Sequence, residues 1–214
     1  MKKISIVGLG YVGLPLLLQI AKKKKVIGFD INKKRINQLL KCNDDYNEHS
    51  SIDIKRVKKN LIFTSDKNKI KNSDLFVVTV PTPVDNKNKP DLKFIIDATK
   101  IIASLIKKDS IVVYESTVFP GCTEEICVPI IEKISKLKFN KDFFCGYSPE
   151  RINVGDPKHK LQSITKIVSG SNSKTTKLLS NFFKRYVTKK IYSSESIKVA
   201  EAAKVIENTQ RDIN

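Results

Sequence analysis

The feature that most constrains the fold of this chain is a glycine-rich segment near its start, Gly8-Leu9-Gly10-Tyr11-Val12-Gly13. Residues 4–7 before it are mostly apolar and predict a buried strand, and residues 14–21 after it predict a helix. In that setting Gly8 makes a tight turn, Gly10 lets the backbone approach a pyrophosphate, and Gly13 lets helix and strand pack closely. The N–H groups at the start of the helix then face the phosphates.

The residues that follow strengthen this interpretation, because a GxGxxG match alone also occurs in ordinary turns. A second predicted strand, residues 26–29, leads into Asp30, and this acid follows Gly8 by 22 residues. A carboxylate about 20 residues after the glycines binds the ribose hydroxyls of a dinucleotide. Asp30 favours NAD, since it would repel a 2′-phosphate, while the basic residues 33–35 leave NADP open as an alternative.

The net charge of +18 raises the question of nucleic-acid binding. Only five of the 40 basic residues are arginine, which is the better residue for bidentate contacts to phosphates and bases. The one tight lysine run, residues 22–25, lies at the end of the first predicted helix, where cations suit the helix dipole. We therefore expect no nucleic-acid partner, and keep that class as a competing hypothesis.

Composition also bears on membranes and metals. No apolar run reaches the roughly 18 residues that span a bilayer, and the chain enters its first strand at once, so we expect no membrane segment, no signal peptide and a cytoplasmic location. The four cysteines show neither CxxC spacing nor a histidine cluster, which predicts reduced thiols and no metal site: Cys42, Cys122, Cys127 and Cys145.

Strand-like and helical segments alternate along the chain. This alternation predicts an α/β fold with a Rossmann-like, doubly wound, mainly parallel sheet that ends in a long helix. The expected strands are residues 4–7, 26–29, 61–63, 74–80, 110–114, 143–147, 164–169 and 189–192. The expected helices are residues 14–21, 33–40, 92–106, 122–137, 175–186 and 195–214, and residues 41–60 are expected to be a charged connection.

Ligands of such sheets gather beyond the carboxyl ends of the strands, so the polar residues there are candidates for chemistry. Thr82 lies between two prolines and Thr117 follows a strand; each is either a turn hydroxyl or a contact to cofactor or substrate. Glu150 is either a surface carboxylate or a general base. Lys204 and Asn208, four apart on the last helix, form either a solvated stripe or a pair that stabilises an oxyanion.

Taken together, these segments resemble the nucleotide-sugar 6-dehydrogenase family, which includes UDP-glucose and GDP-mannose dehydrogenases. The matching segments follow the family's order through essentially the whole chain. They are residues 8–15, Asp30 with Arg35, Pro81-Thr82-Pro83, residues 115–121, Ser148-Pro149-Glu150-Arg151, and residues 200–209.

The resemblance implies oxidation of a sugar C6 alcohol to a carboxylate by two hydride transfers to NAD, through a thioester on a cysteine. It implies that NAD is held by Gly8, Gly10, Tyr11, Val12, Gly13, Asp30, Arg35 and Thr82. It further implies that Thr117 positions the reacting oxygen or water, that Glu150 serves thioester hydrolysis, and that Lys204 with Asn208 stabilises the oxyanion. A homodimer formed through the long helix is implied for the complete protein.

Two departures from the family pattern refine this expectation. Many relatives carry a second glutamate four residues after Glu150, where this chain has Val154, and this variant resembles enzymes of UDP-N-acetylhexosamines. The family's nucleophilic cysteine lies in a glycine-rich segment beyond the long helix, whereas this sequence ends at Asn214. We therefore expect an NAD-binding domain over residues 1–193 and the start of a central helix over 194–214.

The leading hypothesis is thus the N-terminal part of an NAD-dependent UDP-N-acetylhexosamine 6-dehydrogenase for polysaccharide precursors, which binds NAD weakly and is inactive alone. Its alternatives are an NAD-binding module without turnover and a part of a UDP-glucose 6-dehydrogenase. Cys122 and Cys127 precede the sugar-binding region of the family pattern and are not expected to be nucleophiles.

Overall fold

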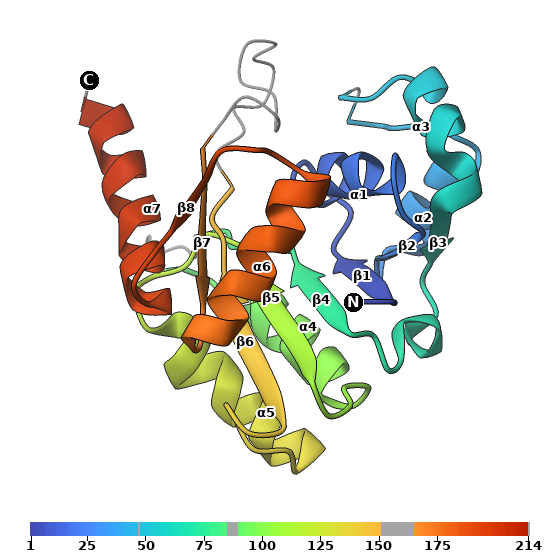
Figure 1. The fold of residues 1–214 in the computed structure, drawn as a ribbon. Coiled ribbons are helices and arrows are strands. Elements are labelled where there is room, and N and C mark those ends of the chain that lie inside the picture. Colours follow the sequence, from blue (N-terminus) through green and yellow to red (C-terminus); the bar gives the residue numbers. More distant parts are fainter. Residues whose placement is uncertain (47, 85–89, 151–164, 214) are drawn as a thin grey trace.

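One eight-stranded sheet, with helices on both faces, forms the centre of the computed structural model, which describes residues 1–46, 48–84, 90–150 and 165–213 (Figure 1). Its strands are β1 (Ile4–Val7), β2 (Val26–Phe29), β3 (Leu61–Thr64), β4 (Leu75–Val78), β5 (Ser110–Tyr114), β6 (Phe143–Tyr147), β7 (Lys166–Gly170) and β8 (Ile191–Ser193). The α-helices are α1 (Gly13–Ala21), α2 (Lys33–Leu40), α3 (Ser51–Val57), α4 (Lys93–Ala103), α5 (Val128–Ser135), α6 (Ser173–Tyr186) and α7 (Ile197–Ile213).

The strand order is β3-β2-β1-β4-β5-β6-β7-β8. The strands from β3 to β6 are parallel to their neighbours, β7 pairs with β6 in antiparallel fashion, and β8 is parallel to β7. The predicted mainly parallel, Rossmann-like sheet is therefore confirmed. From β1 the chain first adds β2 and β3 on one side of the sheet and then crosses over to add β4 on the other side. Doubly wound sheets bind ligands at this switch point between β1 and β4.

Side chains of alternate residues in the central strands point to opposite faces of the sheet and pack in two separate hydrophobic cores. In β4, Leu75 and Val77 pack with α1, α2, α3 and α6, while Phe76 and Val78 pack with α4, α5 and α7. All four of these side chains are fully buried. A strand covered on both faces has no polar alternation, which is why the run of β-branched and aromatic residues predicted a central strand.

Several predicted boundaries were wrong, each for a local reason. The expected connection at residues 41–60 contains α3, because Ser50 and Asp53 form a reciprocal capping box at its start. The expected helix 122–137 begins with a π-helical segment, Cys122–Cys127, and α5 ends where Lys136 takes a left-handed φ of 63°. The expected strand 74–80 is shorter and spans Leu75–Val78, after which the hydroxyl group of Thr79 bonds the glycine loop. Other ends differ by a few residues.

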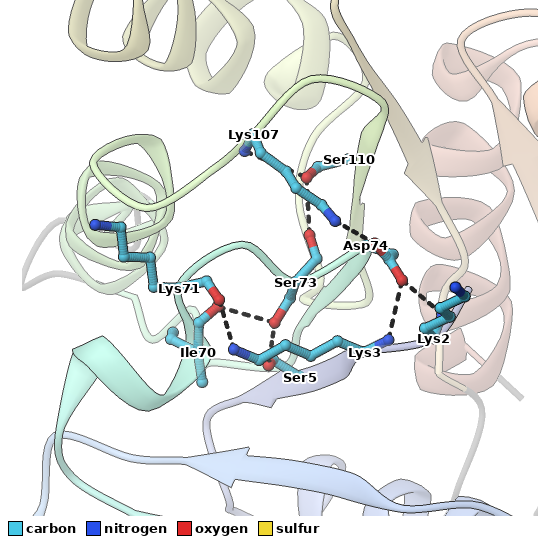
Figure 2. Close-up of polar contacts among 9 residues, drawn as sticks. All are labelled: Lys2, Lys3, Ser5, Ile70, Lys71, Ser73, Asp74, Lys107 and Ser110. Atoms are coloured by element: carbon cyan, nitrogen blue, oxygen red, sulfur yellow. Dashed lines mark hydrogen bonds and ion pairs between the residues drawn. The ribbon is translucent and has the colours of Figure 1, made fainter.

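The amino ends of β1, β4 and β5 meet in a polar network at the edge opposite the glycine loop (Figure 2). The hydroxyl groups of Ser5 and Ser73 lie 2.7 Å apart, and the Ser110 hydroxyl donates to the Ser73 carbonyl at 2.8 Å. Asp74 accepts hydrogen bonds from the Lys2 and Lys3 amides and forms an ion pair with Lys107 at 2.6 Å. This network connects the amino ends of the three strands to one another.

Asp74 is expected to make stability depend on acidity. Burial alone would raise its pKa, but the hydrogen bonds from Lys107, Lys3 and Lys2 outweigh burial and lower the pKa from 3.8 to about 2. A lowered pKa stabilises the fold above the unfolded value and loses that contribution as the pH falls toward 2. We expect Asp74→Asn to lower the free energy of unfolding by about 2 kcal/mol at neutral pH.

Urea unfolding from neutral pH down to the acid range measures this effect. The difference between parent and Asp74→Asn should shrink once the pH is below the unfolded pKa. Asp97→Asn, which removes an exposed ion pair to Lys100, serves as the control and should change little at any pH. A constant difference across the whole pH range would contradict the assignment to Asp74.

Candidate functional site

The glycine loop joins β1 to α1 at the point where the strand order reverses. Gly8 has a φ of 95°, a left-handed conformation that disfavours side chains. A Cβ on Gly13 would lie 1.9 Å from the Gly8 carbonyl oxygen and 2.5 Å from the Thr79 hydroxyl, so helix and loop are in contact there. The Thr79 hydroxyl donates to the Gly8 carbonyl at 2.7 Å and links β4 to the loop.

Open space above the middle of the loop suits a phosphate group. A Cβ on Gly10 would meet no atom within 4 Å, unlike one on Gly8 or Gly13. Helix α1 begins at Gly13 without a side-chain cap, and its N-cap residue Val12 supplies no polar group. An uncapped helix start beside an unobstructed glycine is the arrangement that binds the pyrophosphate of a dinucleotide.

Asp30 and Arg35 both hold the backbone of Leu9. Asp30 follows β2, and its Oδ2 accepts a hydrogen bond from the Leu9 amide at 2.8 Å, while its Oδ1 accepts one from Asn32 at 2.9 Å. The Nε of Arg35, on α2, donates to the Leu9 carbonyl at 2.9 Å. The structure thus brings Asp30 and Arg35 to the glycine loop, where the carboxylate retains acceptor sites for ribose hydroxyls.

The guanidinium group of Arg35 lies between a buried ion-pair partner and an aromatic ring. Its Nη2 lies 2.7 Å from Asp44, and both side chains are at least 95% buried. The guanidinium carbon lies 4.4 Å from the ring centre of Tyr46, which stacks on Tyr11 at 4.3 Å. Sequence reasoning missed Asp44 and Tyr46, because both lie in a polar connection without a periodic pattern. Asp44 offsets the charge of Arg35, one of the three basic residues that left NADP open, whereas Lys33 and Lys34 are exposed.

Thr82 and Thr117 lie together although 35 positions separate them in the sequence. The Thr82 hydroxyl donates to the Thr117 carbonyl at 2.6 Å. The preceding Ser116 donates to the Val80 carbonyl at 2.6 Å and accepts a hydrogen bond from the Tyr147 hydroxyl at 3.1 Å through its own carbonyl. These bonds hold the ends of β4, β5 and β6 in one place and leave the Thr117 side chain exposed.

Glu150 lies in a buried charge cluster that also contains Glu115 and Lys166. The Lys166 ammonium group is 3.1 Å from Glu115 and 3.2 Å from Glu150. The side chains are 5%, 0% and 9% exposed for Lys166, Glu115 and Glu150, respectively. The alternative of a solvated surface carboxylate at Glu150 is therefore wrong. Lys166 was missed, because a lysine within a predicted strand carries no signal of burial.

Helix α7 carries Lys204 and Asn208 and joins the site through Glu201. The fully buried Glu201 accepts hydrogen bonds from the Gly121 amide at 2.6 Å and the Thr123 amide at 2.9 Å. Burial raises the pKa of the Glu201 carboxyl, and these hydrogen bonds offset part of the rise. Lys204 is buried one turn further along and Asn208 is half-buried, so Lys204 does not belong to a solvated stripe.

The environment of the four cysteines bears on whether any of them is reactive. All four are free and buried. The hydrogen bond with Cys127 and burial raise the pKa of the Cys122 thiol, and burial raises the pKa of Cys145. The same hydrogen bond with Cys122 lowers the pKa of the Cys127 thiol. Within the same ranges, no group of three or more His, Cys, Asp or Glu side chains is arranged to hold a metal ion. No helix among them has the length and apolar character that crossing a bilayer requires. Arg151 and Val154 lie outside the described residues.

Comparisons with known proteins agree with this geometry. Residues 2–194 match the model of the UDP-glucose/GDP-mannose dehydrogenase family, NAD binding domain. A UDP-N-acetyl-D-glucosamine 6-dehydrogenase from Salmonella typhi is 50% identical over 99% of this chain and 50% of its own length. Protein CapL from Staphylococcus aureus is 49% identical over 100% of this chain and 50% of its own length. The chain thus spans about half the length of these relatives.

Solved structures show the same similarity in three dimensions. A UDP-D-ManNAc dehydrogenase from Pyrococcus horikoshii superposes with a TM-score of 0.92 at 28% identity, over 99% of this chain and 51% of its own. A GDP-mannose dehydrogenase from Pseudomonas aeruginosa superposes with a TM-score of 0.90 at 26% identity, over 100% of this chain and 50% of its own.

Proposed function

We propose, since this chain belongs to the UDP-glucose/GDP-mannose dehydrogenase family, that it binds NAD for the oxidation of a UDP-sugar at C6. The observation that carries the cofactor part is Asp30, whose carboxylate is fixed on the Leu9 amide beside the open space at Gly10. Arg35, Thr82 and the loop residues Gly8, Tyr11, Val12 and Gly13 complete the proposed NAD site. The NAD-binding domain is proposed to span residues 1–193.

The proposed chemistry assigns separate tasks to the remaining residues. Bound NAD would accept hydride from the sugar C6. Thr117, exposed at the end of β5, would position the reacting oxygen or a water molecule. Glu150 would accept a proton from the water that hydrolyses the acyl intermediate. Lys204 and Asn208 on α7 would stabilise the developing oxyanion.

UDP-N-acetylhexosamines are the proposed substrates, and UDP-glucose is the alternative. Support comes from the Salmonella typhi relative, named for UDP-N-acetyl-D-glucosamine, at 50% identity. The complete product of the gene, given NAD, should release the uronic acid and two NADH per sugar faster from UDP-N-acetylglucosamine or UDP-N-acetylgalactosamine than from UDP-glucose. Faster turnover of UDP-glucose would overturn the substrate assignment. A cytoplasmic location and a homodimer of that product are further parts of the proposal.

An NAD-binding module without turnover is the second candidate, favoured by the burial of all four cysteines. The purified 214-residue chain distinguishes the cofactor proposal from the activity proposal. It should bind NAD and form no uronic acid, and steady formation of the acid by this chain alone would show that its own residues suffice.

Asp30→Asn is expected to weaken NAD binding by about 10–100-fold, because charged hydrogen bonds to the ribose hydroxyls contribute about 1.5–3 kcal/mol. The ratio of NAD to NADP affinity should fall, since the variant no longer repels a 2′-phosphate. Isothermal titration of the chain with NAD and NADP measures both. Asp109→Asn, in an exposed loop with a φ of 64°, is the matched control and should leave both affinities unchanged. Equal NAD affinity of parent and Asp30→Asn would refute the assignment.

A further inference from the structure

Three charged groups from separate segments meet at the carboxyl ends of β5 and β6. Glu115 directly follows β5, Glu150 follows β6, and Lys166 begins β7. Because β7 is antiparallel to β6, its amino end lies at the edge where the parallel strands end. Ser148 fixes this arrangement: its amide donates to the Tyr114 carbonyl at 3.0 Å and its hydroxyl to the Ile167 carbonyl at 2.7 Å.

Among the described residues of this cluster, one cation contacts two carboxyl groups. Lys166 is 3.1 Å from Glu115 and 3.2 Å from Glu150, and it also lies 5.1 Å from the ring centre of Phe183 on α6. Two ionised carboxylates would repel each other in this buried place, which is unfavourable. One of the two carboxyl groups is therefore expected to take up a proton more readily than the other.

Glu115 is the carboxyl group less suited to carry charge. Its Oε1 is buried and has no hydrogen-bond partner, whereas its Oε2 contacts Lys166. Burial and the charge of Glu150 raise the pKa of Glu115 and Lys166 lowers it, and together they raise the pKa from 4.5 to about 7. The neighbouring Tyr147 on β6 is also buried and adds no positive charge.

We propose that Lys166 is a positioning residue, whose ammonium group holds the Glu150 carboxylate at the end of β6 while Glu115 takes up a proton, which removes the repulsion between the two carboxyl groups. This inference rests on the proposed function only for the role of Glu150 in hydrolysis. The buried ammonium group of Lys166 thereby directs the Glu150 carboxylate at the edge where Thr117 also lies.

The test uses the 214-residue chain with ¹³C-labelled glutamate carboxyl groups, assigned with Glu115→Gln and Glu150→Gln. In the parent, the Glu115 resonance should titrate near pH 7. In Lys166→Met, the Glu115 midpoint should rise by about 1–3 pH units, since a nearby opposite charge is lost. The Glu150 resonance, compared at one alkaline pH, should move in Lys166→Met and return in Lys166→Arg. Lys190→Met, at an exposed lysine beside β8, should leave both resonances unchanged.

Glu115→Gln keeps the inference testable if Lys166→Met does not fold. A raised carboxyl pKa costs stability as the pH rises from 4.5 to about 7, so this variant should match the parent below pH 4.5 and exceed it above pH 7. Lower stability of Glu115→Gln above pH 7 would overturn the proposal. An unmoved Glu150 resonance in folded Lys166→Met, or a Glu115 midpoint near 4.5, would do so as well. NAD and sugar are absent from these measurements, so their outcome is independent of the proposed function.

Discussion

Replacing Gly13 by alanine is expected to destabilise the chain by about 3 kcal/mol and to weaken NAD binding at least about 100-fold. The added methyl group would lie 1.9 Å from the Gly8 carbonyl oxygen and 2.5 Å from the Thr79 hydroxyl. The carbonyl belongs to the backbone of the turn, so relief requires the loop to move away from α1. Such a shift also breaks the hydrogen bond between Thr79 and Gly8 that links the loop to β4. Thermal unfolding and titration with NAD measure the two effects.

Gly10→Ala is the matched control, because it adds the same methyl group to the same loop. Nothing lies within 4 Å of that position, so the unfolding midpoint should stay close to that of the parent. The methyl group would, however, occupy the space proposed for the pyrophosphate, and NAD affinity should fall by about tenfold. If both variants lost stability equally, packing at Gly13 would not be the reason for that glycine. If Gly10→Ala bound NAD like the parent, the pyrophosphate would lie elsewhere.

Glu201→Ala is the second change with a large expected effect, a loss of about 2–6 kcal/mol in the free energy of unfolding. The variant leaves the buried amides of Gly121 and Thr123 without an acceptor, and each unsatisfied buried group costs about 1–3 kcal/mol. For a chain of this length the unfolding midpoint should fall by roughly 10 °C. Glu201→Gln should recover only part of the loss, because its NH₂ group would face one of the two amide donors.

Glu125→Gln is the control for the Glu201 contacts, since Glu125 and Lys198 also join residues 121–125 to α7, through an exposed ion pair at 2.9 Å. Exposed pairs contribute little, so its unfolding midpoint should remain nearly that of the parent. Similar losses in Glu201→Ala and Glu125→Gln would mean that the amides of Gly121 and Thr123 find other acceptors. In the complete gene product, Glu201→Ala should also lower kcat, because Lys204 lies one turn away on the same helix.

Much of the fold was predictable because the informative residues are local. The apolar runs of β1, β4 and β5 and the glycines between β1 and α1 define a parallel sheet without any long-range knowledge. The antiparallel pairing of β6 and β7 was not predictable, because the residues of a strand do not by themselves determine its direction in the sheet. The capping box of Ser50 and Asp53 was present in the sequence, but the surrounding charged residues hid α3.

The candidate site divides in the same way. Asp30 and the glycines were found by spacing along one strand-turn-helix unit, which is a local pattern. Asp44 and Lys166 were missed, because each acts on a residue of another segment: Asp44 on Arg35 and Lys166 on Glu150. Only the tertiary structure shows that their charges are buried and paired, and no spacing rule in one sequence contains that information.

The two hydrogen bonds on Leu9 have a consequence for how binding energy is distributed. Its amide is held by Asp30 and its carbonyl by Arg35, so protein groups alone fix the middle of the glycine loop. A pre-organised loop loses little conformational entropy when a ligand binds. Every nucleotide would meet the same ordered loop, so the entropy of ordering it would contribute little to any of their affinities. Differences in affinity between nucleotides should then arise from the contacts that each one makes.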